Sequence, residues 1–419
     1  MLDLLRRRRA VVLLLVWAWV RVMLVLASDP FEMPDTASYT GAAWMRPPVG
    51  RVLLSLLPPL AYTVLSTAVT TAGFVLLAVT VRQRGVGRLG HALVAAIVLV
   101  SLSPMTMVFE HWLTPDSLLV GLGLLGVAAA VRAAESRRAL AACVVTALAL
   151  TLTKEVGVAL AIVIVLVALV RGVDRRSAVA AIAACIVLFV VVVPPASART
   201  GSAYWGRSDD SEISLDRFRI LVVSLIWPDL GDDFAEVERR AEACGMPLIQ
   251  LLFETFRVAG PVDLGDCDEL WVAADELGQG DILLAHLRNP RHVGITVQRS
   301  FANDMSANML WSDAELRPQW LSSGDRWVAG AVGIAPIGAL GWCLVRRRAR
   351  RLAALGLGTS ALALVVGLMD PSAQDRHTIA LRVLAAAIAA IAVADAQRPA
   401  GIADGPLECQ SEEISSTGS

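Results

Sequence analysis

Lysine is almost absent from this sequence, because Lys154 stands alone among 37 basic residues and the others are arginine. The formal net charge is −1, so no excess of basic charge attracts the chain to nucleic acid. The six cysteines form no CxxC pair and no Cys/His cluster at metal-ligand spacing, which argues against a zinc site. We therefore expect no cofactor and no zinc site, while metal dependence stays open, although the lack of a ligand cluster argues against it.

Charged residues are also scarce inside the long apolar runs, where Arg21 is the exception that we single out. Transporters and ion pathways more often carry charged groups near the middle of the membrane. The sequence shows no internal repeat and no sign of the inverted repeats that many transporters have. These absences favour a site at one surface of a membrane bundle over a path through it.

Apolar residues make up 56% of the chain, and the mean hydropathy is +0.62, values typical of a polytopic membrane protein. One stretch, 139–171, is too long for a single crossing, since as one helix it would measure about 50 Å. A hairpin that turns at Lys154-Glu155 fits better. We expect an all-α protein of about ten transmembrane helices, near residues 10–27, 60–81, 89–104, 116–131, 139–153, 156–171, 178–195, 327–345, 352–369 and 377–394.

The arginine clusters support this count. They occur around residues 6–9, 82–88, 132–138, 171–176 and 346–351, and ten crossings place every cluster on the same side. The positive-inside rule then makes both termini cytoplasmic. No clean cleavage site precedes Asp29, so we expect the first apolar run to remain as an anchor. The arginine bias suggests a high-GC genome, and we expect a bacterial inner (plasma) membrane.

The expected topology divides the chain into four parts. An N-terminal transmembrane module contains a first outer loop, and a long extracytoplasmic region separates it from the last helices. The C-terminal tail is polar and is expected to be disordered in the cytoplasm. The bounds are 1–195 with the loop at 28–59, then 196–326, 327–395 and 396–419.

The extracytoplasmic region has helical patterns and two cysteines. An Asn289-Pro290 break is expected to divide the last pattern into two short helices. Cys244 and Cys267 share this oxidising region with no other thiol, so we expect a disulfide between them. The three helical patterns are Phe234–Cys244, Pro247–Val258 and Asp281–Met309.

Acidic and basic side chains gather at the ends of apolar runs on the expected outer side. Such groups suit a substrate that is part lipid and part sugar phosphate, because cations neutralise a phosphate leaving group. A carboxylate can take the proton from an attacking hydroxyl, and nearby carboxylates stabilise an oxocarbenium-like transition state. The candidates are Asp29, Glu32, Asp35, Tyr39, Arg46, Arg51, Glu110, His111, Asp116, Lys154, Glu155, Asp370, Asp375, Arg376 and His377.

Several short motifs among these residues occur in a characteristic order. They are Asp35-Thr-Ala-Ser-Tyr39, Arg46-Pro47-Pro48, Glu110-His-Trp-Leu-Thr-Pro-Asp116, Leu152-Thr153-Lys154 and Asp375-Arg376-His377. The long extracytoplasmic region adds the segment HLRNPRHVGITVQRSF. In order and sidedness the chain resembles the GT-C superfamily of integral-membrane glycosyltransferases. The resemblance is to the branch of protein O-mannosyltransferases and the lipid A aminoarabinose transferase, and covers most of residues 1–200 and the last three spans.

The resemblance implies a role for each matching residue. Asp35 would be the catalytic carboxylate, and Lys154 and Arg376 would contact the phosphate of a polyprenyl-phosphate sugar. The remaining substrate-binding residues would be Tyr39, Arg46, Glu110, His111 and Asp116, with Glu110 and Asp116 shaping the sugar or acceptor pocket. Thr36 stands where relatives often have a second acidic residue, so Asp29 or Glu32 is left to supply that charge. The acceptor would be a glycan, a lipid or a protein.

Several of these candidate residues also have a purely structural interpretation. Asp35 is suited to N-cap a helix over residues 36–44, and Asp116 is suited to begin one. Lys154-Glu155 is equally typical of a snorkelling turn, and Arg376 of an interfacial anchor. We expect ordinary surface or interface positions for His111, His286 and His292. Two other functions remain open, a flippase or transporter of lipid-linked glycan and a non-catalytic envelope scaffold.

Overall fold

The computed structural model of the chain describes most of the apolar runs and part of the long polar region. The described residues form α-helices and contain no β-strand. They are residues 2–27, 30, 47–103, 106, 110–111, 113–193, 220, 223–224, 230–244, 268–297, 321–346, 349–369 and 374–397. The helices are α1 (Leu2–Leu26), α3 (Pro48–Leu56), α4 (Pro59–Arg84), α5 (Gly87–Ser101), α7 (Asp116–Ala130), α8 (Arg137–Thr153), α9 (Gly157–Val170), α10 (Arg175–Val192), α13 (Asp232–Ala243), α15 (Asp268–Asp275), α16 (Gln279–Arg288), α17 (Pro290–Val297), α18 (Leu321–Val345), α19 (Arg350–Met369) and α20 (Gln374–Ala396).

The protein is an all-α polytopic membrane protein. Each of the ten predicted apolar runs is a helix, and the predicted hairpin is present because α8 ends at Thr153 and α9 begins at Gly157. Among the described residues, four helical segments are long and apolar enough to cross a membrane: Pro59–Arg84, Arg175–Val192, Arg350–Leu368 and Thr378–Ala396. The shorter apolar helical segments are Val12–Leu26, Gly87–Ser101, Asp116–Ala130, Gly157–Val170 and Gly333–Val345.

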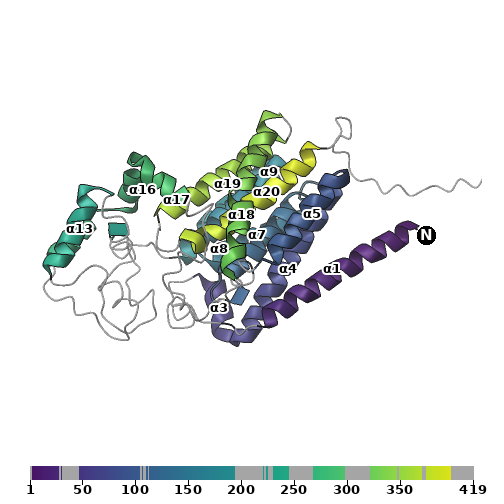
Figure 1. Ribbon diagram of the computed structural model, residues 1–419, viewed down its shortest axis with the longest axis horizontal. Helices are drawn as coiled ribbons and strands as arrows, with labels where there is room; N and C mark the ends of the chain where they lie inside the picture. The colour runs from purple at the N-terminus through teal and green to yellow at the C-terminus, as the bar shows by residue number, and fades with distance from the viewer. Residues whose placement is uncertain are drawn as a thin grey trace, which may run out of the picture.

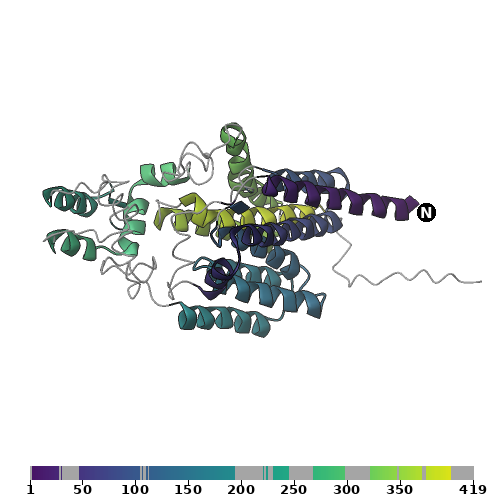
Figure 2. The same ribbon diagram turned by 90° about the horizontal axis from the view of Figure 1, so that it is seen from below.

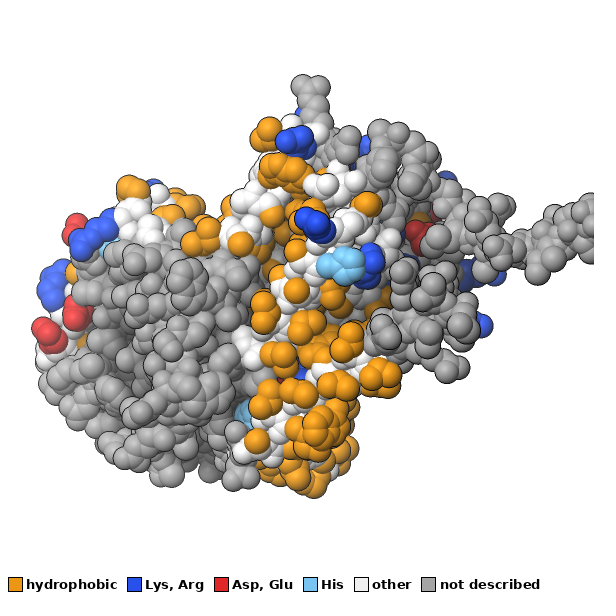
Figure 3. Space-filling view, turned by 45° about the vertical axis from the view of Figure 1, so that its right-hand side comes forward, with side chains coloured by type: hydrophobic (Ala, Val, Ile, Leu, Met, Phe, Trp, Pro, Cys, Tyr) orange, Lys and Arg blue, Asp and Glu red, His pale blue; other side chains and the backbone are white. Residues whose placement is uncertain are grey.

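The apolar helices lie side by side in one bundle (Figures 1 and 2). Helix α20 lies inside it and packs against α4, α7, α18 and α19, and most of its described side chains are buried. Helix α1 packs on α4 and diverges from the bundle towards its own N-terminus (Figure 1). On the face in Figure 3, hydrophobic side chains cover much of the bundle surface, as expected of a surface that faces lipid.

Charged side chains tie four helices together at one end of the bundle. Arg84, at the end of α4, contacts Asp395 of α20 at 3.3 Å and Glu135, which follows α7, at 3.2 Å. Arg171, which follows α9, also pairs with Asp395. The arginine-rich ends of these helices therefore meet at the same end of the molecule, as the alternating topology predicts.

Helices α4 and α7 approach each other closely along their backbones near the start of α7. A Cβ atom added to Gly121 of α7 would lie 2.8 Å from the backbone nitrogen of Thr70 in α4. One added to Gly73 of α4 would lie 2.8 Å from the carbonyl oxygen of Gly121. Small residues let helix backbones approach in this way within a membrane. The two helices therefore form a rigid frame for the residues that begin α7.

The outer region lies beyond the opposite end of the bundle from the N-terminus (Figures 1 and 2). The predicted helix at 234–244 is present as α13, and the predicted break at Asn289-Pro290 separates α16 from α17. Both α16 and α17 pack against α19. The predicted helix Pro247–Val258 and residues 298–309 lie outside the described residues, and α15 is a helix that we did not predict.

Cys244 follows α13 and is disulfide-bonded, whereas Cys143, Cys185 and Cys343 are free and buried. Cys267 lies outside the described residues, so its pairing with Cys244 stays a prediction. We expected surface or interface positions for the histidines, and the surface alternative is wrong, since His111, His286 and His292 are all buried. The His286 and His292 rings face each other across the α16–α17 break, with centroids 5.8 Å apart.

Candidate functional site

A buried ion pair joins two of the predicted site residues. Lys154 Nζ donates a hydrogen bond of 2.6 Å to Asp116 Oδ1. Both side chains are almost fully enclosed, at 5% and 1% exposure. The interpretation of Lys154 as a snorkelling residue is therefore wrong, because its ammonium group turns into the bundle rather than out to the surface.

Local sequence accounts for both positions. Pro115 precedes α7 and Asp116 is its first residue, where a carboxylate is stabilised by the positive end of the helix dipole. Lys154 follows the last residue of α8, in the extended conformation. The turn then needs Gly157, because a Cβ atom there would lie 1.8 Å from the carbonyl oxygen of Leu150. This tight hairpin aims Lys154 back towards α7.

The end of the first loop packs against the residues that come just before the two members of this pair. Helix α3 begins at Pro48, a residue suited to the first helical position, and places Gly50 in the interface with α8. A Cβ atom on Gly50 would lie 2.7 Å from the carbonyl oxygen of Thr153 and 3.1 Å from Pro115 Cβ. Gly50 thus touches the residues that directly precede Asp116 and Lys154. Three connections that are distant in sequence meet at this point.

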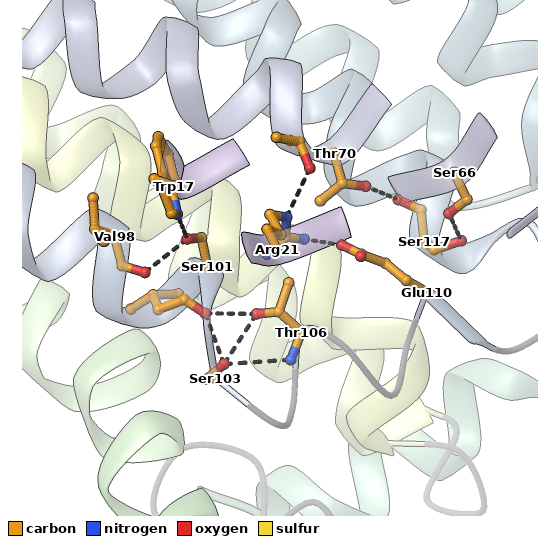
Figure 4. A network of polar contacts seen from close by, with 12 residues as sticks. Trp17, Arg21, Ser66, Thr70, Val98, Ser101, Ser103, Thr106, Glu110 and Ser117 are labelled. Carbon is orange, nitrogen blue, oxygen red and sulfur yellow. Dashed lines mark hydrogen bonds and ion pairs between the residues drawn. The ribbon is translucent and has the colours of Figure 1, made fainter. Parts of the chain in front are cut away.

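A second buried ion pair lies close by. Arg21 of α1 pairs with Glu110, which belongs to the segment between α5 and α7, and the two side chains are 0% and 1% exposed. Arg21 Nε also donates to Thr71 Oγ1 at 2.8 Å, and Arg21 Cζ lies over the ring of Phe74, 5.1 Å from its centroid. Figure 4 shows how these contacts connect α1, α4 and the segment that carries Glu110.

One stripe of α1 makes polar contacts with the bundle. Trp17, Arg21 and Val25 follow one another at intervals of one helical turn and are buried. The Trp17 indole donates to Ser101 Oγ at the end of α5 at 2.9 Å, and the Val25 carbonyl oxygen contacts His111 Nε2. Helix α1 therefore holds the end of α5 and, at Glu110 and His111, the segment that leads to Asp116.

Helix α4 presents a continuous polar stripe to the interior along its first half. Tyr62, which donates to the Thr114 carbonyl oxygen at 2.7 Å, begins this polar stripe. The stripe consists of Tyr62, Thr63, Ser66, Thr67, Thr70 and Thr71, all buried. The next buried residues of α4 are Gly73, Phe74, Leu77 and Ala78, which are apolar, and Thr80 and Arg84 are buried near the end of the helix. An apolar stretch near the middle of α4 therefore separates the polar stripe from the polar residues at the far end.

The predicted site residues separate into three groups. The structure brings Asp116 together with Lys154, and it places Glu110 and His111 against α1. Arg376 lies in the first turn of α20, with a side chain that is not described. Asp35, Tyr39 and Arg46 lie outside the described residues, so their roles stay predictions.

The sequence interpretation underestimated the importance of two buried arginines. Arg21 appeared there as an isolated charge, but it is the partner of Glu110. Arg382 was overlooked: it lies inside α20 and its side chain is 2% exposed, so Arg21 is not the only charge within the predicted spans. An arginine within an apolar run is itself a signal of a functional or paired residue, and that signal was available at Arg382.

The described part of the site contains carboxylates, a lysine, arginines and hydroxyls. Among the described residues, no three His, Cys, Asp or Glu side chains come close enough to hold a metal ion. A lysine fixed beside a carboxylate places a positive charge that attracts an anionic group. The arrangement therefore suits the binding of a phosphate and the transfer of a proton.

Comparisons with known proteins add little information about the site. No protein-family model matches the chain, and no curated protein matches it. Among solved structures, the chain is similar to the crystal structure of ArnT from Cupriavidus metallidurans bound to undecaprenyl phosphate. The two share 17% sequence identity over 92% of this chain and 77% of that chain, with a TM-score of 0.32. A likeness of this degree transfers no residue role to this chain.

Proposed function

We propose that the protein transfers a sugar from a polyprenyl-phosphate donor to an acceptor at the outer rim of the bundle. The observation that carries this proposal is the meeting of α3, the start of α7 and the α8–α9 turn around Asp116 and Lys154. A lipid-linked donor has its phosphate at the membrane surface, at the depth of these helix ends. A phosphate leaving group needs a fixed cation, and Lys154 is held in place by Asp116.

In this proposal Asp35 is the general base that accepts the proton of the attacking hydroxyl. Arg376 supplies a second positive charge to the phosphate, and Tyr39 and Arg46 contribute to donor binding. Glu110 and His111 act by holding the segment that leads to Asp116. The outer region, proposed as a unit spanning residues 196–326, contributes to binding of the acceptor.

An apolar break in the buried face of α4 supports an enzyme over a transporter. A transport path would need polar side chains along the whole length of the bundle. The buried face of α4 is polar from Tyr62 to Thr71 and apolar from Gly73 to Ala78, before Thr80 and Arg84 near its end. A site that opens to one side needs only the polar stretch from Tyr62 to Thr71.

The test is to incubate the purified full-length protein with a panel of polyprenyl-phosphate sugars and measure the release of free polyprenyl phosphate. Release above that of heat-inactivated protein, with at least one donor, is the expected result. Absence of release with every donor and acceptor would contradict the enzyme proposal. Replacing residues 28–46 by a neutral linker abolishes release in this account, whereas a scaffold would keep its function.

A further inference from the structure

A small cavity lies beside Glu110, between α4, α7 and α20. Its volume is about 10 Å³, which is room for about one water molecule. The polar residues that line it are Thr70, Thr106, Glu110 and Ser117, and the apolar ones are Val120, Ile379 and Val383. Figure 4 shows Thr70, Thr106 and Ser117 around the Arg21–Glu110 pair.

The hydrogen bonds around the cavity leave specific groups available. Glu110 Oε1 pairs with Arg21, but Glu110 Oε2 has no hydrogen-bond partner among the described residues. Thr70 Oγ1 uses its proton to donate to the Ser117 carbonyl oxygen at 3.2 Å, so its lone pairs can accept. Ser117 Oγ accepts from Ser66, so its own proton can be donated.

We infer that one internal water molecule binds in this cavity and bridges Glu110 to the hydroxyl groups of Thr70 and Ser117. The water donates one hydrogen bond to Glu110 Oε2 and one to Thr70 Oγ1, and it accepts one from Ser117. Internal waters typically make about three hydrogen bonds of this kind. The water satisfies a buried carboxylate oxygen, which would otherwise carry an uncompensated desolvation penalty.

Charge balance favours water over a metal cation of similar size. The Glu110 carboxylate is already neutralised by Arg21, so a bound cation would leave a net positive charge in a buried place. Water adds hydrogen bonds without adding charge. This inference concerns the bundle itself and does not depend on the proposed transferase activity.

The test is X-ray radiolytic hydroxyl labelling of the full-length protein in lipid nanodiscs, read out by mass spectrometry. Hydroxyl radicals formed from a bound water oxidise the side chains that touch it, even when they are buried. Val120, Ile379 and Val383 should therefore be labelled several-fold faster than Val163 and Val165 of α9. The matched residues are equally buried, at 5% and 3% exposure against 5% for Val120. Equal rates in the two groups would overturn the inference.

A cavity-filling variant gives a second measurement. Val120→Ile adds a methyl group to the cavity wall and should displace the water, so labelling at Ile379 and Val383 falls to the rate of Val163. The control Val165→Ile should leave both rates unchanged. Labelling at Ile379 and Val383 that persists in Val120→Ile would contradict a cavity-bound water. If Val120→Ile prevents folding, the wild-type comparison alone decides the question.

Discussion

Lys154 and Asp116 are joined by a buried hydrogen bond of 2.6 Å, although each stands in a different connection of the bundle. Asp116 begins α7 and Lys154 follows α8, and the helix α3 from the first loop packs on the residues just before both. The pair therefore marks the point where the first loop meets two other connections. It is also the place where an anion would find the one lysine of the chain.

The first prediction concerns this pair. Lys154→Met leaves Asp116 buried without its partner, and loss of one member of a buried ion pair typically costs about 3–5 kcal/mol. The exchange Asp116→Lys with Lys154→Asp keeps both charges and should recover much of that stability. Donor turnover should not recover, because the cation then lies at the wrong helix end. Thermal unfolding and release of polyprenyl phosphate measure the two effects separately.

Conservative substitutions serve as the matched controls for this exchange. Lys154→Arg and Asp116→Glu keep each charge in its own connection and should preserve measurable release. Full activity in the exchanged double variant would show that the pair is only structural, and Lys154 would lose its proposed role at the phosphate.

The second prediction concerns Arg21 and Glu110. Arg21→Leu should destabilise the protein by about 3–5 kcal/mol, because it strands a buried carboxylate. The double variant Arg21→Leu with Glu110→Leu should be more stable than Arg21→Leu, since an apolar pair needs no charge compensation. Thermal unfolding in the same detergent provides the comparison. The exposed Arg88, replaced by leucine, is the control and should leave stability unchanged.

The double variant also separates positioning from stability. If the Arg21–Glu110 contact positions the segment that leads to Asp116, the double variant should bind donor less tightly even where its stability is restored. A double variant with wild-type turnover and wild-type affinity would show that this contact does not position the site.

The third prediction concerns the contact of α3 with the site. Gly50→Ala would place a Cβ atom 2.7 Å from the backbone carbonyl oxygen of Thr153, which cannot move without shifting α8. The expected loss is about 1–3 kcal/mol of stability, as in other overpacked sites, with a larger proportional loss of activity. Gly358→Ala in α19 is the control, since nothing lies within 4 Å of a Cβ atom there. If the two variants had equal stability and activity, α3 would not contribute to the site.

The fourth prediction concerns pH and the outer region. Burial, with the nearby His292 adding to it, lowers the pKa of His286 from its ordinary value of 6.5 to about 4. The unfolded chain therefore binds more protons than the folded one between these pH values, so stability falls as pH decreases through this range. At pH 5 the loss relative to pH 7.5 is about 2 kcal/mol.

Hydrogen exchange of α16 and α17 at the two pH values measures this effect. Intrinsic amide exchange is slower at pH 5, so the quantity to compare is the protection factor, which is corrected for the intrinsic rate. Protection of α16 and α17 should be lower at pH 5 than at pH 7.5 in the wild type. His286→Leu carries no imidazole to protonate and should lose much less protection. If the wild type and His286→Leu respond equally to pH, His286 is not the group that titrates.

Much of the fold follows from the sequence, because a bilayer-length apolar run has few alternatives to a helix. The hairpin at Lys154 was predictable, since a charged pair and a glycine interrupt a run that is too long for one crossing. Helix α3 was not predicted because its nine residues were assigned to the first outer loop, although they are amphipathic and begin at a proline. Helix α15 was missed because a short helix depends on contacts with α13 more than on its own pattern.

The site was predicted as a set of residue types rather than as a set of pairs. The predicted membrane topology placed Glu110, Asp116 and Lys154 at one end of the bundle. The hydrophobic periodicity of the helices cannot say which cation pairs with which carboxylate. Arg21 paired with Glu110 across 89 positions of sequence. That choice depends on how α1 lies against α4, which is a property of packing rather than of local sequence.

The most direct measurement is the release of polyprenyl phosphate by Asp35→Asn, compared with the wild type in the same donor panel. The substitution keeps the size of the side chain and removes the proposed base. We predict that release falls to the background of heat-inactivated protein while thermal unfolding stays unchanged. Release at a near wild-type rate by a correctly folded Asp35→Asn protein would contradict the account of this rim as a glycosyl-transfer site.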